Sequence, residues 1–254
     1  MSFKTTLEDA AEEAGRLALL SGQAVRALFS PPWEPRAWIV QMEQIGVRSL
    51  LVAAITTIFT GMVLALQTAL ALPTLGVKYY IGLVVSKSLV RELVPVLVAL
   101  IVGGRIGAGM TAEIGTMKVT EQVDALRAMG ADPVRKLVVP KLAASLVMIP
   151  ALTVLGDLLG ILGGLVIATL QLDLSASFYL NDVLSALTLE DIFSGLAKSF
   201  FFGFFIAIVA CHHGLTARGG ADGVGRATTN TVVLASILIL VSDFLLTKLF
   251  SLLP

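Results

Sequence analysis

Four ionisable residues lie within stretches that are otherwise strongly apolar: Arg91, Glu92, Lys198 and Asp243. A charge at the centre of a membrane helix costs about 2.5–3.5 kcal/mol on insertion scales, so such charges pair with one another or face a wet cavity. At about 1.5 Å per residue, Arg91, Lys198 and Asp243 lie roughly 15, 9 and 10 Å from the expected outer ends of their helices. With Glu92, they are expected to form one charged layer in the outer half of a membrane.

The composition indicates that most of the chain lies in lipid. Of its 254 residues, 56% are hydrophobic and 14% are charged, and the mean hydropathy is +0.91, whereas about a quarter of the residues in a soluble domain are charged. The apolar runs are long and unbroken, which favours helices over the short alternating segments of a β-barrel. We therefore predict an all-α, polytopic integral membrane protein.

Five apolar segments are each long enough to cross a bilayer, which takes about 20 residues in a helix. They cover about residues 50–72, 81–110, 137–172, 192–215 and 231–250. Pro73 and Gly76 mark the turn after the first span, and the third is long enough to hold a break or tilt near Pro150. A polar connection over 173–191 and a glycine-rich loop over 216–230 are expected between the later spans.

The N-terminal part, residues 1–47, is expected to form interfacial helices, and residues 48–254 the transmembrane domain. Residues 5–29 are amphipathic, which suits either a helix on the membrane surface or a frayed soluble helix. Pro31, Pro32 and Pro35 end it, and a second short interfacial helix is expected around residues 38–44. Four acidic residues near the start argue against a signal peptide, so the first span is expected to direct insertion.

Residues 118–130 predict a short amphipathic helix between the second and third spans. Its apolar positions share one helical stripe: Val119, Val123, Leu126 and Met129. Gly130 is a typical helix end, and Asp132-Pro133 is a typical helix start. Such a helix could lie on lipid headgroups or seat in a groove of a partner protein, and periodicity alone slightly favours the headgroups.

The distribution of basic residues orients the spans. Lys and Arg are frequent before the first span and in the loops after the second and fourth, whereas residues 173–191 carry four acids and no Lys or Arg. The positive-inside rule therefore puts the N-terminus in the cytoplasm and the C-terminus outside.

Several activities find no support in the residues. No Gly-Lys pair occurs, so no P-loop can cradle ATP phosphates. The adjacent His212 and His213 have no partner at ligand spacing and are expected to be interfacial. The single Cys211 excludes an internal disulfide, no nucleophile elbow is present, and no basic stripe indicates nucleic acid. We expect no catalytic, cofactor or metal site in this chain.

Two segments carry a family resemblance. The run GGRIGAGMTAEIGTMKVTEQVDALRAMGADPVRKLVVPK, residues 103–141, resembles the signature region of the MlaE (YrbE-like) permeases associated with MCE proteins. The run GGADGVGRATTNTVVLAS, residues 219–236, resembles the family's second cytoplasmic segment. One departure is Val94, where such proteins usually carry glycine.

The resemblance implies an ABC transporter permease in the inner membrane that pairs with itself and has no enzymatic activity of its own. It implies that a cytoplasmic ATPase subunit handles ATP. It also implies two further partners, an MCE-domain protein on the periplasmic side and often a small STAS-domain subunit. It also implies movement of phospholipids between the inner membrane and the outer envelope. The ATPase would dock on the helix described above, through Glu121, Gln122, Asp124, Leu126, Arg127 and Met129.

The charged layer then has two interpretations. In one, Arg91 and Lys198 meet a lipid phosphate, while Glu92 and Asp243 hold the two cations when no lipid is bound. In the other, the four charges form a structural network that only fixes helix packing. A rival function is an ion- or proton-coupled secondary transporter or channel, with the same four residues as a relay. A membrane scaffold that only anchors partners is disfavoured, because charged residues within a membrane are costly unless they are used.

Small residues one helical turn apart let helices approach closely. They occur as Gly156-xxx-Gly160-xxx-Gly164 in the third span and as Gly103-xxx-Gly107 near the end of the second. They could serve packing between two copies, but packing within one chain is expected for at least one of them.

The predicted orientation can be tested by thiol labelling. In a background lacking Cys211, a cysteine at Ser177 should react with a membrane-impermeant reagent in whole cells, because residues 173–191 are expected in the periplasm. A cysteine at Ala221 should stay unreacted until the cells are lysed. The opposite labelling pattern would invert the topology.

Overall fold

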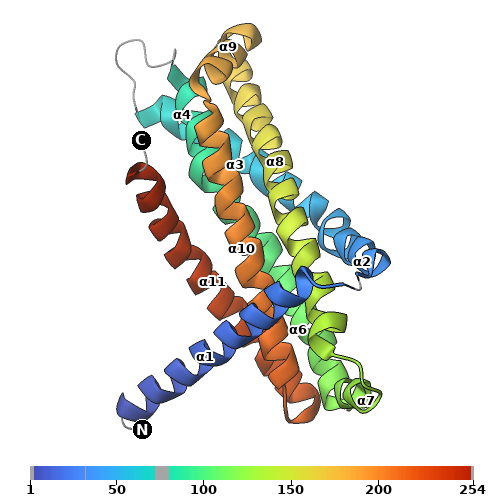
Figure 1. Cartoon of the computed structure of the whole chain (residues 1–254). Coiled ribbons are helices and arrows are strands. Elements are labelled where there is room, and N and C mark those ends of the chain that lie inside the picture. The colour runs from blue at the N-terminus through green and yellow to red at the C-terminus, as the bar shows by residue number, and fades with distance from the viewer. Residues whose placement is uncertain (1–2, 32, 72–79, 253–254) are drawn as a thin grey trace. The chain divides into compact units, whose positions relative to one another are not determined.

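The computed structural model describes residues 3–31, 33–71 and 80–252, and within these ranges the regular structure is entirely helical (Figure 1). The all-α prediction is confirmed. The predicted features at Pro32, Pro73 and Gly76, and the expected end of the first span at residue 72, lie outside the described residues.

The elements follow one another along the chain as short and long helices. They are α1 Phe3–Leu28, α2 Pro35–Ile45, η1 Val47–Ser49, α3 Leu50–Ala71, α4 Ile81–Ser88, η3 Leu89–Leu93, α5 Val94–Leu97, η4 Val98–Val102, α6 Gly103–Val119, α7 Gln122–Ala128, η5 Val134–Val138, α8 Val139–Leu170, α9 Ala176–Ala186, α10 Leu189–Thr216 and α11 Gly220–Leu252. The short elements η3, η4 and η5 are π-helical, and η1 is a 3₁₀ turn.

Within the described residues, five helical segments are long and apolar enough to cross a membrane, which confirms the five predicted spans. They are Pro35–Leu70, Ile81–Val119, Val134–Leu170, Leu189–Thr216 and Gly220–Leu252. The helix at the N-terminus, α1, is also present. Its place on a membrane surface remains a prediction, as does the division of the chain at residue 47.

The second span is longer than predicted, because its helix continues past Met110 to Val119. The predicted span ends before the polar Thr111, yet the Thr111 side chain is fully buried. Its hydroxyl lies 2.9 Å from the Gly107 carbonyl oxygen, 3.1 Å from that of Ala210 and 2.8 Å from the Thr231 hydroxyl. A threonine whose hydrogen bonds are met inside the protein does not end a helix.

The expected glycine-rich loop over 216–230 is wrong, since α11 begins at Gly220 and the turn occupies only residues 217–219. Gly219 and Gly220 have φ of +88° and +65°, which glycine adopts readily. A Cβ atom at Gly223 would lie 1.7 Å from the Arg218 carbonyl oxygen. These glycines therefore make a tight turn and let the helix begin directly after it.

The polar connection over 173–191 holds a helix of its own, α9. Ser175 caps it, because its hydroxyl accepts a hydrogen bond from the Phe178 backbone N–H. Asp182 of α9 accepts one from the Leu83 N–H at 2.9 Å, and α9 lies beside α4 (Figure 1). The third span shows no break at Pro150, because α8 is continuous through it.

The chain divides into two compact units. Unit 1 comprises residues 1–45, 104–146 and 204–238, and unit 2 comprises residues 46–103, 147–203 and 239–254. In unit 1, Leu20 and Ala24 of α1 are buried in a core with residues of α6, η5, α8 and α10: Ile114, Val138, Leu142, Ala207, Ile208 and Cys211. The apolar side of α1 is therefore used for packing within the protein.

In unit 2, glycines bring α3 and α8 into backbone contact. A Cβ atom at Gly61 would lie 1.9 Å from the Gly160 carbonyl oxygen, and one at Gly163 would lie 2.3 Å from that of Ile58. At Gly164, a Cβ atom would lie 2.5 Å from the Tyr179 hydroxyl. The expectation of packing within one chain is confirmed for the glycines of the third span.

This contact predicts a cost for Gly61→Ala. The added methyl group overlaps backbone atoms, so we expect the free energy of unfolding to fall by about 1–3 kcal/mol. Thermal unfolding in detergent measures the change. Gly22→Ala is the matched control, because no atom lies within 4 Å of its Cβ position and alanine stabilises a helix by roughly 0.5–1 kcal/mol over glycine. Equal unfolding temperatures for the two variants would contradict the packing.

Candidate functional site

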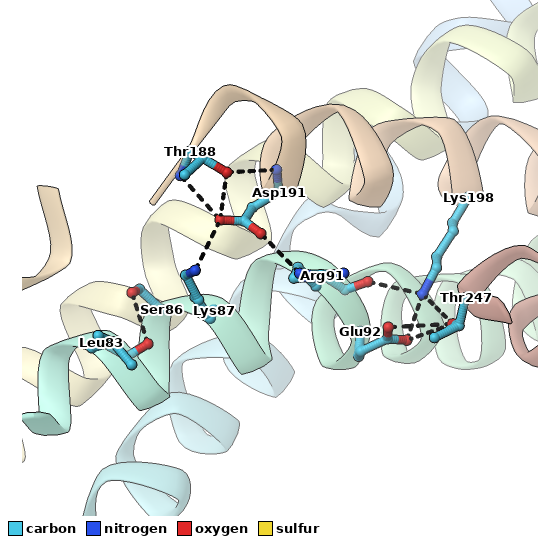
Figure 2. A network of polar contacts seen from close by, with 9 residues as sticks. All are labelled: Leu83, Ser86, Lys87, Arg91, Glu92, Thr188, Asp191, Lys198 and Thr247. Carbon is cyan, nitrogen blue, oxygen red and sulfur yellow. Dashed lines mark hydrogen bonds and ion pairs between the residues drawn. The ribbon is translucent and has the colours of Figure 1, made fainter. Parts of the chain in front are cut away.

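The charged layer predicted from the sequence lies in unit 2 and centres on Lys198, whose side chain is fully buried. Its ammonium donates hydrogen bonds to Glu92 Oε2 at 2.5 Å, to Thr247 Oγ1 at 2.7 Å and to the Arg91 carbonyl oxygen at 3.1 Å (Figure 2). An ammonium has three donors, so each finds an acceptor. Asp243 Oδ1 lies 3.3 Å away and adds an ion pair.

Three helices position these groups. Lys198 lies on α10, Glu92 in the π-helical turn η3, and Asp243 and Thr247 one turn apart on α11. Pro95 has no N–H for the Arg91 carbonyl one turn earlier, and Lys198 donates to that oxygen. Gly195 permits the approach of α10, because a Cβ atom there would lie 2.2 Å from the Val90 carbonyl oxygen.

The Arg91 side chain has a different partner from the one expected. Its guanidinium lies 3.2 Å from Asp191 Oδ1, and Lys87 Nζ lies 3.7 Å from Asp191 Oδ2 (Figure 2). Among the described residues, Glu92 and Asp243 form ion pairs only with Lys198. The expected four-residue layer therefore resolves into two charge clusters within unit 2. Whether either cluster lies on a substrate path remains a prediction.

Sequence reasoning missed Asp191, although a local signal for it exists. The Thr188 N–H and hydroxyl donate to Asp191 Oδ2 at 3.0 and 2.9 Å, and the Asp191 N–H donates to the Thr188 hydroxyl at 3.3 Å. This reciprocal pattern is a capping box, with Asp in place of Glu, directly before an apolar run. It fixes the start of α10 and holds a nearly buried carboxylate beside Arg91.

Arg91 also lines an open pocket of about 420 Å³ in unit 2. The other lining residues are charged, polar and apolar: Leu189, Glu190, Asp191, Phe193, Ser194 and Phe250. The Arg91 side chain is 40% exposed, whereas that of Lys198 is enclosed. Of the two cations assigned to a lipid phosphate, Arg91 is accessible and Lys198 is saturated by the protein.

The helix predicted over 118–130 is shorter in the structure. Glu121 has a left-handed φ of +61° and separates Val119, in α6, from α7. The predicted stripe therefore does not lie on one helix. Val123 is buried and anchors α7 in unit 1, whereas Met129 is 74% exposed.

The predicted end of that helix and the restart after it are confirmed. The Gly130 N–H donates to the Arg127 carbonyl and the Ala131 N–H to that of Leu126, with Gly130 at a φ of +77°, which is a Schellman motif. Asp132 Oδ1 accepts from the Val134 N–H at 2.9 Å.

Asp124 organises the charges of α7. Lys118 Nζ lies 2.7 Å from its Oδ2, and Arg127 Nη1 lies 3.0 Å from its Oδ1. The hydrogen bond from Lys118 holds the pKa of Asp124 below its ordinary value. The carboxylate is exposed and ionised at neutral pH, so α7 presents a fixed arrangement of charges beside its apolar end.

The two histidines are buried in unit 1, close to the end of α10 at Thr216. Their position at the membrane interface remains a prediction. His213 Nδ1 lies 2.9 Å from the Thr231 hydroxyl and its Nε2 lies 3.1 Å from Glu13 Oε1. These contacts connect α10 to α11 and α1. Across the described residues, no group of three or more His, Cys, Asp or Glu side chains could hold a metal ion.

Comparison with known proteins agrees with this architecture. Residues 38–249 match the family model described as Permease MlaE, so the chain belongs to the MlaE permease family. It is 44% identical over 240 residues to a "Probable ABC transporter permease protein" of Rickettsia bellii, covering 94% of this chain and 93% of the relative. The protein is thus a multi-pass membrane protein and an ABC transporter permease subunit.

Relatives also occur in a cyanobacterium and in a plant. A "Probable ABC transporter permease protein" of Synechocystis is 43% identical over 230 residues, covering 91% of this chain and 88% of that one. The chloroplastic "Protein TRIGALACTOSYLDIACYLGLYCEROL 1" of Arabidopsis thaliana is 35% identical over 232 residues, covering 91% of this chain and 66% of that one.

The Lys198 cluster predicts a sharp response to mutation. Lys198→Met leaves Glu92 and Asp243 without their cation, and we expect a loss of about 3–5 kcal/mol in stability. The triple variant with Glu92→Gln and Asp243→Asn removes all three charges and should recover most of the folded yield. Arg91→Met should cost less than Lys198→Met, because Lys87 and Thr188 still hold Asp191.

Folded yield by size-exclusion chromatography and thermal unfolding in detergent measure these effects. A Lys198→Met variant as stable as the unmodified protein would contradict the structural role of this cluster.

Proposed function

We propose that this chain is the permease subunit of an ATP-driven transporter that moves phospholipids between the inner membrane and the outer envelope. It lies in the inner membrane with a cytoplasmic N-terminus, pairs with a second copy and works with a separate ATPase subunit. An MCE-domain protein on the periplasmic side, and a STAS-domain subunit below the ATPase, complete the assembly. Membership of the MlaE permease family is the observation that carries this proposal.

The pocket at Arg91 supports a phospholipid as the substrate. A guanidinium can hold a phosphate through two parallel hydrogen bonds, and Leu189, Phe193 and Phe250 supply apolar surface next to it. A phospholipid has the same combination of an anionic headgroup and apolar chains. Asp191 would hold Arg91 while the pocket is empty and release it when a phosphate arrives.

The name of one relative is compatible with a lipid substrate. The Arabidopsis relative carries the name of a diacylglycerol glycolipid, which shares its two acyl chains with phospholipids. On this basis the apolar part of the ligand is the common feature, and Arg91 selects for a phosphate.

The helix α7 supports docking of an ATPase. It is joined to two spans by short links, is anchored by the buried Val123 and presents exposed charges together with Met129. An exposed apolar side chain beside fixed charges suits a groove on a partner protein. Motion of the partner would reach the second and third spans directly through these links.

A second copy of the chain would find apolar surface on α11. Several large apolar side chains on this helix are more than half exposed: Val233, Ile237, Leu240, Val241, Phe244, Leu245 and Leu249. Lipid tails could cover the same surface, so pairing rests on the family.

The proposal predicts that α7 holds the ATPase. In the variant Leu126→Asp, Met129→Asp, we expect at least about tenfold less ATPase to co-purify, because two apolar contacts are lost and two charges are introduced. Leu184→Asp on α9 is the matched control, as Leu184 is 75% exposed, and it should keep the ATPase. Phospholipid transfer from proteoliposomes should require ATP and should fail in the double variant.

Two results would contradict the proposal. Full ATPase yield with the double variant would show that α7 is not the dock. Transfer driven by an ion or proton gradient without ATP hydrolysis would favour the secondary transporter, with Arg91, Glu92, Lys198 and Asp243 as its relay.

A further inference from the structure

A second pocket, of about 550 Å³, lies in unit 1 between the start of α2, the middle of α6 and the start of the third span. Its charged and polar lining consists of Glu34, Arg36, Gln41, Glu113, Lys136 and Lys141. Val40, Leu137 and Pro140 add apolar surface. None of these residues belongs to the pocket at Arg91, and the proposed transport reaction does not use them.

Lys141 is the buried cation of this pocket, with only 2% of its surface exposed. Its ammonium donates to Glu113 Oε2 at 2.6 Å and to Gln41 Oε1 at 3.2 Å. An ammonium has three donors, and among the described residues no acceptor meets the third. An unmet N–H on a buried cation is costly, so an oxygen atom of a ligand that accepts from it would be favoured.

Arg36 and Lys136 lie at the same pocket and are both exposed. Lys136 forms an ion pair with Glu34, whereas the Arg36 guanidinium has no hydrogen-bond or ion-pair partner in the part of the chain that the structure describes. Together with Lys141, three cations face two carboxylates, which leaves a net charge of +1. One phosphodiester, with a charge of −1, would neutralise the pocket.

The position of the pocket along the chain indicates where such a phosphate comes from. It lies at the beginning of the apolar helix Pro35–Leu70, the first of the five spans. Trp33 and Trp38 are immediate neighbours, since they line an adjoining hollow together with Glu34 and Pro140. Tryptophan is enriched at the level of lipid headgroups, and the apolar lining suits the region directly beneath them.

We propose that this pocket binds the phosphate of a phospholipid headgroup, with Arg36 as its main ligand. The guanidinium engages the phosphate oxygens in pairs, the third N–H of Lys141 reaches the same group, and the acyl chains run along Val40 and Leu137. The site differs from the transported lipid's pocket in unit 2. It requires only that the chain lies in a bilayer, so it stands independently of the proposed transport.

A photoreactive amino acid at Val40, which is 47% exposed, tests this site in intact membranes. After illumination, mass spectrometry of the purified protein counts phospholipid adducts. In Arg36→Gln, Lys136→Gln we expect at least about tenfold fewer adducts, because charge-assisted hydrogen bonds are lost. Arg16→Gln, Arg26→Gln removes two exposed cations from α1 and should leave the yield unchanged. Arg36→Lys keeps the charge and should retain part of it.

A second measurement separates a lipid from a free anion. With delipidated protein in detergent, a short-chain phosphatidylglycerol should raise the unfolding temperature, and it should not do so for Arg36→Gln, Lys136→Gln. Inorganic phosphate should leave the temperature unchanged. Equal adduct yields in the double variant and its control, or an equal stabilisation by inorganic phosphate, would overturn the proposal, provided that both variants elute as folded protein.

Discussion

The buried ammonium of Lys198 is the interaction on which unit 2 depends. A cation within a membrane protein must find acceptors inside the protein, and this one takes hydrogen-bond acceptors from η3 and α11. The π-helical turn, Pro95 and Gly195 all serve that geometry, because they open a backbone carbonyl and bring α10 close to it. Three helices that are distant in the sequence are thereby held at one point.

This constraint gives the two cations of the layer different roles. Lys198 is saturated by its partners, so it is available to a ligand only if the cluster breaks, whereas Arg91 is held by one carboxylate at the edge of an open pocket. Such an arrangement places a structural charge in contact with the residue that carries an accessible charge, since Lys198 donates to the Arg91 carbonyl oxygen. Unit 1 follows the same pattern, with the buried Lys141 beside the exposed Arg36.

Much of the fold could be predicted, since the length and polarity of an apolar run decide whether a helix crosses a membrane. The sequence also indicated that Lys198, Glu92 and Asp243 meet, because an intramembrane charge needs a partner. It could not show that Arg91 turns towards Asp191, because that depends on the capping box of α10 and the rotation of η3. The loops were predicted less well: Thr111 is satisfied inside the bundle and the glycines near 220 make a tight turn, so both helices extend beyond their apolar cores.

The central claim is that Arg91 receives the lipid phosphate while Lys198 holds the helices. Phosphorus analysis of purified, folded protein measures it most directly, as phospholipid retained per chain. In a background carrying Arg36→Gln and Lys136→Gln, which empties the pocket of unit 1, we expect Arg91→Gln to lower the retained phospholipid by about tenfold, whereas the neutral triple variant of Lys198, Glu92 and Asp243 should retain the amount found in that background. The reverse result, with lipid lost from the triple variant and kept by Arg91→Gln, would contradict the account.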